Sequence, residues 1–173
     1  MKGISHFLTL SLLTPGIALA HRQCKTSPMD ASWPSIEEWN ALNKSIDGTL
    51  IQTAPAASAC YPGNPFNVSS SCAEARKNWN YVDYQARLPE GIDAPIYANN
   101  SCLPPGSSGY TASKGCSVGG APAYVVEARN ERQIATAVAW ASKRNIRIVV
   151  KGTGHDYNGR YGDIPCVVAE IWS

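Results

Sequence analysis

A glycine-rich turn behind an apolar run constrains this sequence more than any other feature. Residues 146–150 (Ile-Arg-Ile-Val-Val) have the β-branched, apolar character of a buried strand. Gly152, Gly154 and Gly159 then fall within eight positions and let the backbone turn tightly and approach a ligand closely. Successive N–H groups in such a turn form a concave anion site, and His155 adds a nucleophilic imidazole in its middle. The stretch predicts a phosphate- or pyrophosphate-binding loop that carries a reactive histidine.

Two familiar phosphate loops do not fit this turn. Gly154 and Gly159 have the spacing of a P-loop, but Arg160 and Tyr161 stand where that motif requires Lys and then Ser or Thr. Gly152 and Gly154 begin a dinucleotide fingerprint, but its third glycine comes too late and no helix pattern follows. On composition alone, a plain glycine-rich turn with an exposed histidine is the other interpretation.

The residues before the turn predict a βαβ unit. Residues 123–128 are rich in aromatic and β-branched residues, as in a strand. Asn130 is a good N-cap, and Gln133 three residues later is its capping-box partner, so a helix is predicted to start there. Its expected buried stripe consists of Ile134, Val138 and Ala141, widened by Ala135 and Ala137. The second strand of such a unit runs parallel to the first, and its carboxyl end is where α/β sheets bind ligands.

The first 122 residues predict less regular structure. Ser35 and Glu38 form a capping box that starts a short helix, with Gly48 as its stop. The residues expected on the buried face of that helix are Ile36, Trp39 and Leu42. Residues 50–51 suit a short strand and residues 71–79 a second short helix, whereas the prolines and glycines of residues 86–122 indicate a long irregular connection.

The N-terminus has the organisation of a secretory signal peptide. Lys2 supplies the positive region, an apolar stretch follows, and Ala18-Leu19-Ala20 is an A-x-A cleavage signature, so His21 is the expected first residue of the mature chain. An uncleaved signal anchor is the minor alternative. We therefore expect a secreted protein with no membrane contact after cleavage.

Cysteines and sequons agree with export. All six cysteines follow the expected cleavage point, where oxidising conditions preserve disulfides. Six cysteines allow 15 connectivities, and the pairs expected here are those that close short loops, Cys60–Cys72 and Cys102–Cys116. Three N-glycosylation sequons begin at Asn43, Asn67 and Asn99.

Charge and composition exclude some functions. Lys and Arg number 15 against 13 Asp and Glu, and no basic stripe with interleaved aromatic residues is present, so nucleic acid is not an expected partner. We assign no catalytic residue and no metal site in this chain.

The turn at residues 151–160, Lys-Gly-Thr-Gly-His-Asp-Tyr-Asn-Gly-Arg, resembles the flavin-attachment loop of fungal secreted FAD-linked oxidases. These enzymes are of the vanillyl-alcohol-oxidase (VAO) type, close to the berberine-bridge-enzyme-like group, and have a PCMH-type FAD-binding domain. The resemblance extends through most of the chain before Arg160. Its further motifs are Trp33-Pro34-Ser35, Trp39-Asn40-x-Leu42-Asn43, Cys60-Tyr61, Ser101-Cys102-x-Pro104 and Gly120-x-Pro122-x-Tyr124-Val125-Val126.

The resemblance implies FAD as cofactor and a small molecule as the substrate that is oxidised, in fungal secondary metabolism. In the family the loop wraps the FAD pyrophosphate, and the histidine matched by His155 bonds covalently to the flavin 8α carbon. The implied cofactor-binding residues are Lys151, Gly152, Thr153, Gly154, His155, Asp156, Asn158, Gly159 and Arg160. Alternatives stay open at three of them: Lys151 and Arg160 as solvated ends of strand and loop, and Asp156 as a turn former rather than an orienter of the His155 ring.

The fold expected on this basis is α+β. Residues 1–20 are the signal peptide, residues 21–122 a loop-rich N-terminal extension, and residues 123–173 an incomplete FAD-binding domain that holds its first βαβ unit. The sequence departs from the family after Arg160, whereas family members continue well beyond this length, so a truncated and inactive oxidoreductase is expected. The competing hypothesis is a small secreted cysteine-containing binding protein without flavin.

Overall fold

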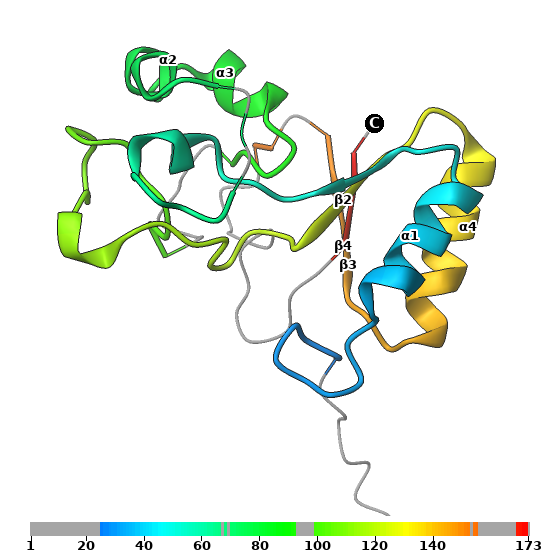
Figure 1. Ribbon diagram of the computed structural model, residues 1–173. Helices are drawn as coiled ribbons and strands as arrows, with labels where there is room; N and C mark the ends of the chain where they lie inside the picture. The colour runs from blue at the N-terminus through cyan, green and yellow to red at the C-terminus, as the bar shows by residue number, and fades with distance from the viewer. Residues whose placement is uncertain are drawn as a thin grey trace, which may run out of the picture.

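A four-stranded sheet forms the centre of the molecule (Figure 1). The computed structural model describes residues 25–66, 68, 70–92, 99–152 and 154–155, and the backbone of 169–172. The strand order is β1-β2-β4-β3, for β1 (Leu50–Gln52), β2 (Tyr124–Glu127), β4 (Ala169–Trp172) and β3 (Ile148–Lys151). β4 pairs in parallel with both β2 and β3, and β1 pairs antiparallel with β2.

The helices and irregular segments cover the sheet from two sides. The helical elements are α1 (Ile36–Ser45), η1 (Ala56–Cys60), α2 (Cys72–Asn78), α3 (Val82–Arg87), η3 (Ala112–Lys114) and α4 (Glu131–Lys143). In Figure 1, α1 and α4 lie on one side of the sheet, and α2, α3 and the long irregular segments lie on the other. We call these the helical face and the extension face. The α+β class expected from the sequence is confirmed. Among the described residues, no helix is long and apolar enough to cross a membrane.

Helix α1 starts where its capping box predicts. The Ser35 Oγ accepts a hydrogen bond from the Glu38 N–H at 3.4 Å, and the Glu38 carboxylate accepts one from the Ser35 N–H at 3.0 Å. Trp39 and Leu42 are buried as expected, but Ile36 is 52% exposed, so its assignment to the buried face is wrong. Ile36 lies in the first turn of α1, before the helix makes contact with the sheet.

Helix α4 also starts at its predicted cap but buries a partly different face. The Asn130 side chain accepts from the Gln133 N–H at 3.1 Å, so the predicted N-cap is confirmed. The predicted capping box is not formed, because the Gln133 side chain accepts from the Arg129 N–H at 2.8 Å. The predicted stripe is wrong at Ile134 and Val138, which are 37% and 41% exposed, and at Ala135, which is exposed. It is confirmed at Ala137 and Ala141, which are buried. The buried residues of α4 are Gln133, Ala137 and Ala141. Small side chains on this face let α4 pack closely beside α1.

An aromatic cluster fills the space between the helices and the sheet. The Trp39 ring stacks on Tyr124 with centroids 3.9 Å apart and tilts against Trp140 at 4.6 Å. Arg144 covers the outer side of the cluster, with its guanidinium carbon 4.1 Å from the Trp140 ring centroid and a 2.9 Å ion pair to Glu38. The helical face is therefore held mainly by apolar burial.

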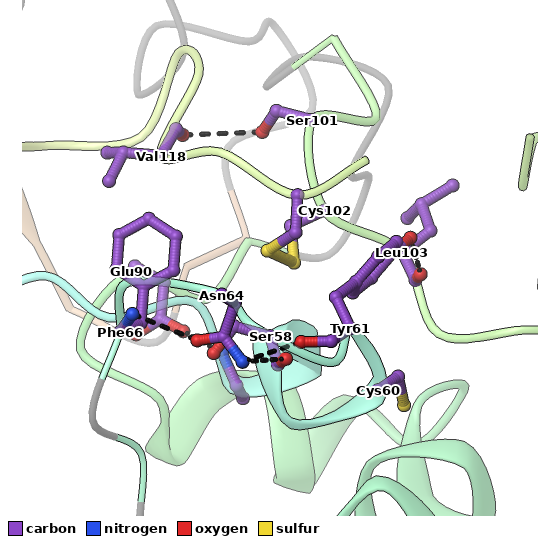
Figure 2. Close-up of a disulfide and its surroundings, with 12 residues drawn as sticks. Ser58, Cys60, Tyr61, Asn64, Phe66, Glu90, Ser101, Cys102, Leu103 and Val118 are labelled. Atoms are coloured by element: carbon purple, nitrogen blue, oxygen red, sulfur yellow. Dashed lines mark hydrogen bonds between the residues drawn. A yellow bond between two sulfur atoms is a disulfide. The ribbon is translucent and has the colours of Figure 1, made fainter. Parts of the chain in front are cut away.

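The extension face is held by cross-links and polar bonds to the backbone. The predicted disulfides Cys60–Cys72 and Cys102–Cys116 are both confirmed. Figure 2 shows the Tyr61 hydroxyl donating to the Leu103 carbonyl, at 2.6 Å, beside the second disulfide. The predicted helix at residues 71–79 is confirmed as α2. The 3-10 helix η3 is the regular element within residues 99–122, in agreement with the long connection expected there.

The sheet contains more strands than the isolated βαβ unit that was expected. β4 lies between β2 and β3, and β1 pairs with the other edge of β2, so β2 has no open edge. β1 comes from the loop-rich region before residue 122, so that region contributes a strand to the same sheet. The predicted signal peptide, Cys24 and Cys166 lie outside the described residues.

Candidate functional site

The glycine turn leaves the sheet at the carboxyl end of β3, as the sequence predicts. Lys151 is the last residue of β3 and stands in register with Trp172 of β4. Of the predicted cofactor-binding residues, the structure brings together Lys151, Gly152, Gly154 and His155. The others lie outside the described residues: Thr153, Asp156, Asn158, Gly159 and Arg160.

The turn is open to solvent at Gly152 and at His155, whereas Gly154 between them is buried. A Cβ placed on Gly152 would meet no atom within 4 Å, and the residue is exposed. Gly154 has φ +88°, in the left-handed region that favours glycine, so the chain bends sharply there. His155 follows and is exposed. Backbone N–H donors in such a bend form the concave site that suits phosphate oxygens, so the residues present fit a pyrophosphate group.

Lys151 is buried on the extension face of the sheet. Its side chain has 0% exposure, and its ammonium donates to the Leu88 carbonyl at 2.5 Å and to the Pro89 carbonyl at 3.4 Å. The interpretation of Lys151 as a solvated strand end is therefore wrong. The ammonium is engaged with a backbone segment more than 60 residues earlier in the chain.

Residues 88–92, which follow α3, also pack directly against the turn. A Cβ on Gly154 would lie 3.2 Å from the Gly91 carbonyl oxygen and 3.2 Å from the Lys151 Cε. Gly91 is itself confined, because a Cβ there would come within 2.0 Å of the Gln85 carbonyl oxygen. Residues 88–92 fall within the long irregular connection predicted at residues 86–122. No local sequence pattern indicates that they contact the turn.

Glu90 lies in the same segment and shares its surroundings with Lys151. Its carboxylate accepts a hydrogen bond from the Ala56 N–H at 2.9 Å. Burial raises the pKa of the Glu90 carboxyl, while hydrogen bonds from its own backbone and from Ala56, and then the charge of Lys151, oppose that rise. An acidic and a basic side chain thus stand together behind the turn.

Two of the three predicted glycosylation sites lie within the described residues. Asn43 lies in α1, and its side-chain oxygen accepts from the Leu50 N–H at 3.0 Å. Asn99 is exposed, has φ +58°, and its backbone carbonyl accepts from the Lys114 ammonium. Asn67 lies outside the described residues. Glycosylation at these positions stays a prediction.

Comparison with known proteins identifies the part of the chain that holds the turn. Residues 122–170 match the FAD binding domain family. The FAD-linked oxidoreductase apf9 of Gibberella fujikuroi is 40% identical over 160 residues, which are 90% of this chain and 26% of that protein. The VAO-type flavoprotein oxidase VAO615 of Thermothelomyces thermophilus is 35% identical over 161 residues, 89% of this chain and 27% of that protein. The chain spans about a quarter of the length of the curated relatives it matches.

Solved structures agree with the sequence matches. The crystal structure of the VAO-type flavoprotein MtVAO615 from Myceliophthora thermophila superposes with a TM-score of 0.74 at 32% identity, covering 87% of this chain and 27% of that one. MtVAO713 from the same organism gives a TM-score of 0.72 at 32% identity, covering 86% and 25%. These findings favour the flavoprotein hypothesis over a small binding protein without flavin. Over most of its length the chain is similar to VAO-type FAD-linked oxidoreductases, and residues 122–170 match the FAD binding domain family.

Proposed function

We propose that this chain holds FAD by its pyrophosphate at the turn after β3 and tethers the flavin through the imidazole of His155. The observation that carries the proposal is the position of an exposed histidine directly after a left-handed glycine, at the carboxyl end of a parallel strand. Gly152 leaves the backbone accessible there, and the FAD-binding match covers the same residues. In this proposal, the turn would hold the imidazole in position before the bond to the flavin forms. Such positioning is how a protein accelerates a reaction of this kind.

The wider activity is proposed from the relatives. The relatives are named FAD-linked oxidoreductases. When bound, FAD would supply the redox chemistry, for which we propose a small molecule as the substrate. This chain contributes the binding turn, the sheet that carries it and the extension packed behind it. The residues that select a substrate are not assigned among those described.

Covalent flavin on the denatured polypeptide tests the proposal. The chain would be produced with FAD, denatured, and separated on a gel viewed for flavin fluorescence. We expect a fluorescent band that is lost in His155→Ala and kept in His21→Ala, the matched histidine control. A band that survives His155→Ala would reject the tethering role. If the unaltered chain carries no flavin, either covalent or dissociable, FAD binding by this chain is refuted.

Secretion and glycosylation are proposed as well, on the evidence of the N-terminal pattern and the three sequons. Expression in a fungal secretory host should deliver a chain that begins at His21 and moves faster on a gel after glycosidase treatment. Retention of residues 1–20, or unchanged mobility after treatment, would contradict these two proposals respectively.

A further inference from the structure

The burial of Lys151 requires an explanation that phosphate binding does not supply. Lysine is almost never fully buried unless its charge is partnered. Here the side chain is fully buried, and its ammonium donates to the carbonyls of Leu88 and Pro89. These are backbone groups of a distant segment, on the extension face of the sheet, so the charge connects that segment to the end of β3.

A second contact joins the same two segments. The Gly91 carbonyl lies so close to Gly154 that a methyl group on Gly154 would press against it. Gly91 is confined, because a Cβ there would come within 2.0 Å of the Gln85 carbonyl oxygen. Gln85 is itself fixed by a 2.8 Å hydrogen bond that its side-chain amide donates to the Trp79 carbonyl. The turn is thus supported at Lys151 and again at Gly154, three residues apart.

We infer that Lys151 is a positioning residue: its buried ammonium fixes the turn that carries His155 to residues 88–92, and it does not bind the phosphates itself. The consequence for flavin attachment rests on the function proposed above. A misplacement of about 1 Å at a reacting group can cost about a hundredfold in rate, so anchoring of this turn has a direct chemical effect. Residues 88–92 then act on the site through their contacts with Lys151 and Gly154.

Amide hydrogen exchange in the flavin-free chain tests the anchor independently of FAD. Lys151→Met removes the charge and the donor while keeping an unbranched side chain only one atom shorter, and Lys143→Met alters an exposed lysine of α4 as the matched control. We expect the amides of Gly152, Gly154 and His155 to exchange about tenfold faster or more in Lys151→Met, since a charged buried hydrogen bond is lost. The control should match the unaltered chain.

Two results would overturn the inference. One is unchanged exchange at these three amides in Lys151→Met. The other is a uniform acceleration across β2 and α4 as well, which would mean general destabilisation. If Lys151→Met does not fold, Lys151→Gln takes its place, because its shorter polar side chain no longer reaches the carbonyls and must produce the same local acceleration.

A titration with inorganic pyrophosphate separates anchoring from direct binding. If Lys151 were a phosphate ligand, its replacement would weaken pyrophosphate binding while leaving exchange in the free chain unchanged, and the inference would be wrong. If the unaltered chain binds neither pyrophosphate nor FAD, the proposed function fails, while the exchange result still decides whether Lys151 anchors the turn.

Discussion

The two faces of the sheet are stabilised by different physical interactions. On the helical face, Trp39 and Tyr124 stack within a cluster of apolar side chains. The extension face is stabilised mainly by two disulfides, by hydrogen bonds to backbone carbonyls and by the buried Lys151. The main aromatic and apolar cluster therefore lies on one side of the sheet, whereas the turn after β3 is contacted from the other side. Perturbations of the two faces should therefore have separable effects.

The largest expected effect is on the helical face. Trp39→Ala removes the fully buried centre of the aromatic cluster and should lower the free energy of unfolding by about 3–5 kcal/mol. Trp33→Ala is the control, because Trp33 is only partly buried beside the same cluster and should cost clearly less. Urea denaturation followed by far-UV circular dichroism measures both. Equal losses would mean that Trp39 is not the centre of the core.

The next effect concerns the extension face. Replacing Cys102 and Cys116 together by Ala opens a loop with a sequence separation of 14 and should cost about 3 kcal/mol. Hydrogen exchange should accelerate around residues 101–118 and stay unchanged in α1 and α4. Equal acceleration in the two helices would contradict the separation of the faces.

A smaller effect is expected where the extension meets the turn. Gly91→Ala forces a methyl group against the Gln85 carbonyl and should destabilise the chain by about 1–3 kcal/mol. Gly152→Ala meets no atom and should change stability by about 0.5 kcal/mol or less, which makes it the matched control. Thermal unfolding of the two variants gives the comparison, and similar melting temperatures would show that Gly91 is not confined.

The smallest effect concerns the pKa values of two glutamates, which shift in opposite directions. The Ser35 N–H bond, and then Arg144, lower the pKa of Glu38 from its ordinary 4.5, whereas burial raises the pKa of Glu90 above the same value. Stability from Glu38 is therefore present above pH 4.5 and lost as the pH falls through its lowered pKa. For Glu90 the contribution is present below pH 4.5 and lost as the pH rises through its raised pKa. NMR titration of the two carboxyl carbons should give the higher pKa to Glu90, and the reverse order would refute the assignment.

Features that depend on neighbouring residues could be predicted from the sequence. The starts of α1 and α4 were predictable because a cap and its partner lie within three residues, as Ser35 with Glu38 and Asn130 with Gln133. The two disulfides close short loops, and His155 follows its strand within a recognisable glycine pattern. For these features the local sequence contains the physical cause.

Features that depend on residues far apart in the chain could not be predicted from the sequence. Ile134 and Gln133 lie on adjacent faces of α4, and the face that is buried is decided by α1, where the Gln133 amide donates to the Ile46 carbonyl at 3.1 Å. The anchoring of Lys151 needs carbonyls more than 60 residues away, which no periodicity reveals. β4 is absent from the elements predicted from the sequence, although residues 167–172 are apolar except for Glu170 and rich in β-branched residues, as in a strand.

The central claim is that FAD is bound at the turn after β3. Its most direct test is a titration of the isotope-labelled chain with FAD, followed by amide NMR. We expect the largest chemical-shift changes at the amides of Gly152, Gly154 and His155. FAD binding at this turn would be refuted if those amides did not shift and the changes lay elsewhere, for example around the apolar hollow of about 480 Å³ that Met29, Phe66 and Tyr124 help to line.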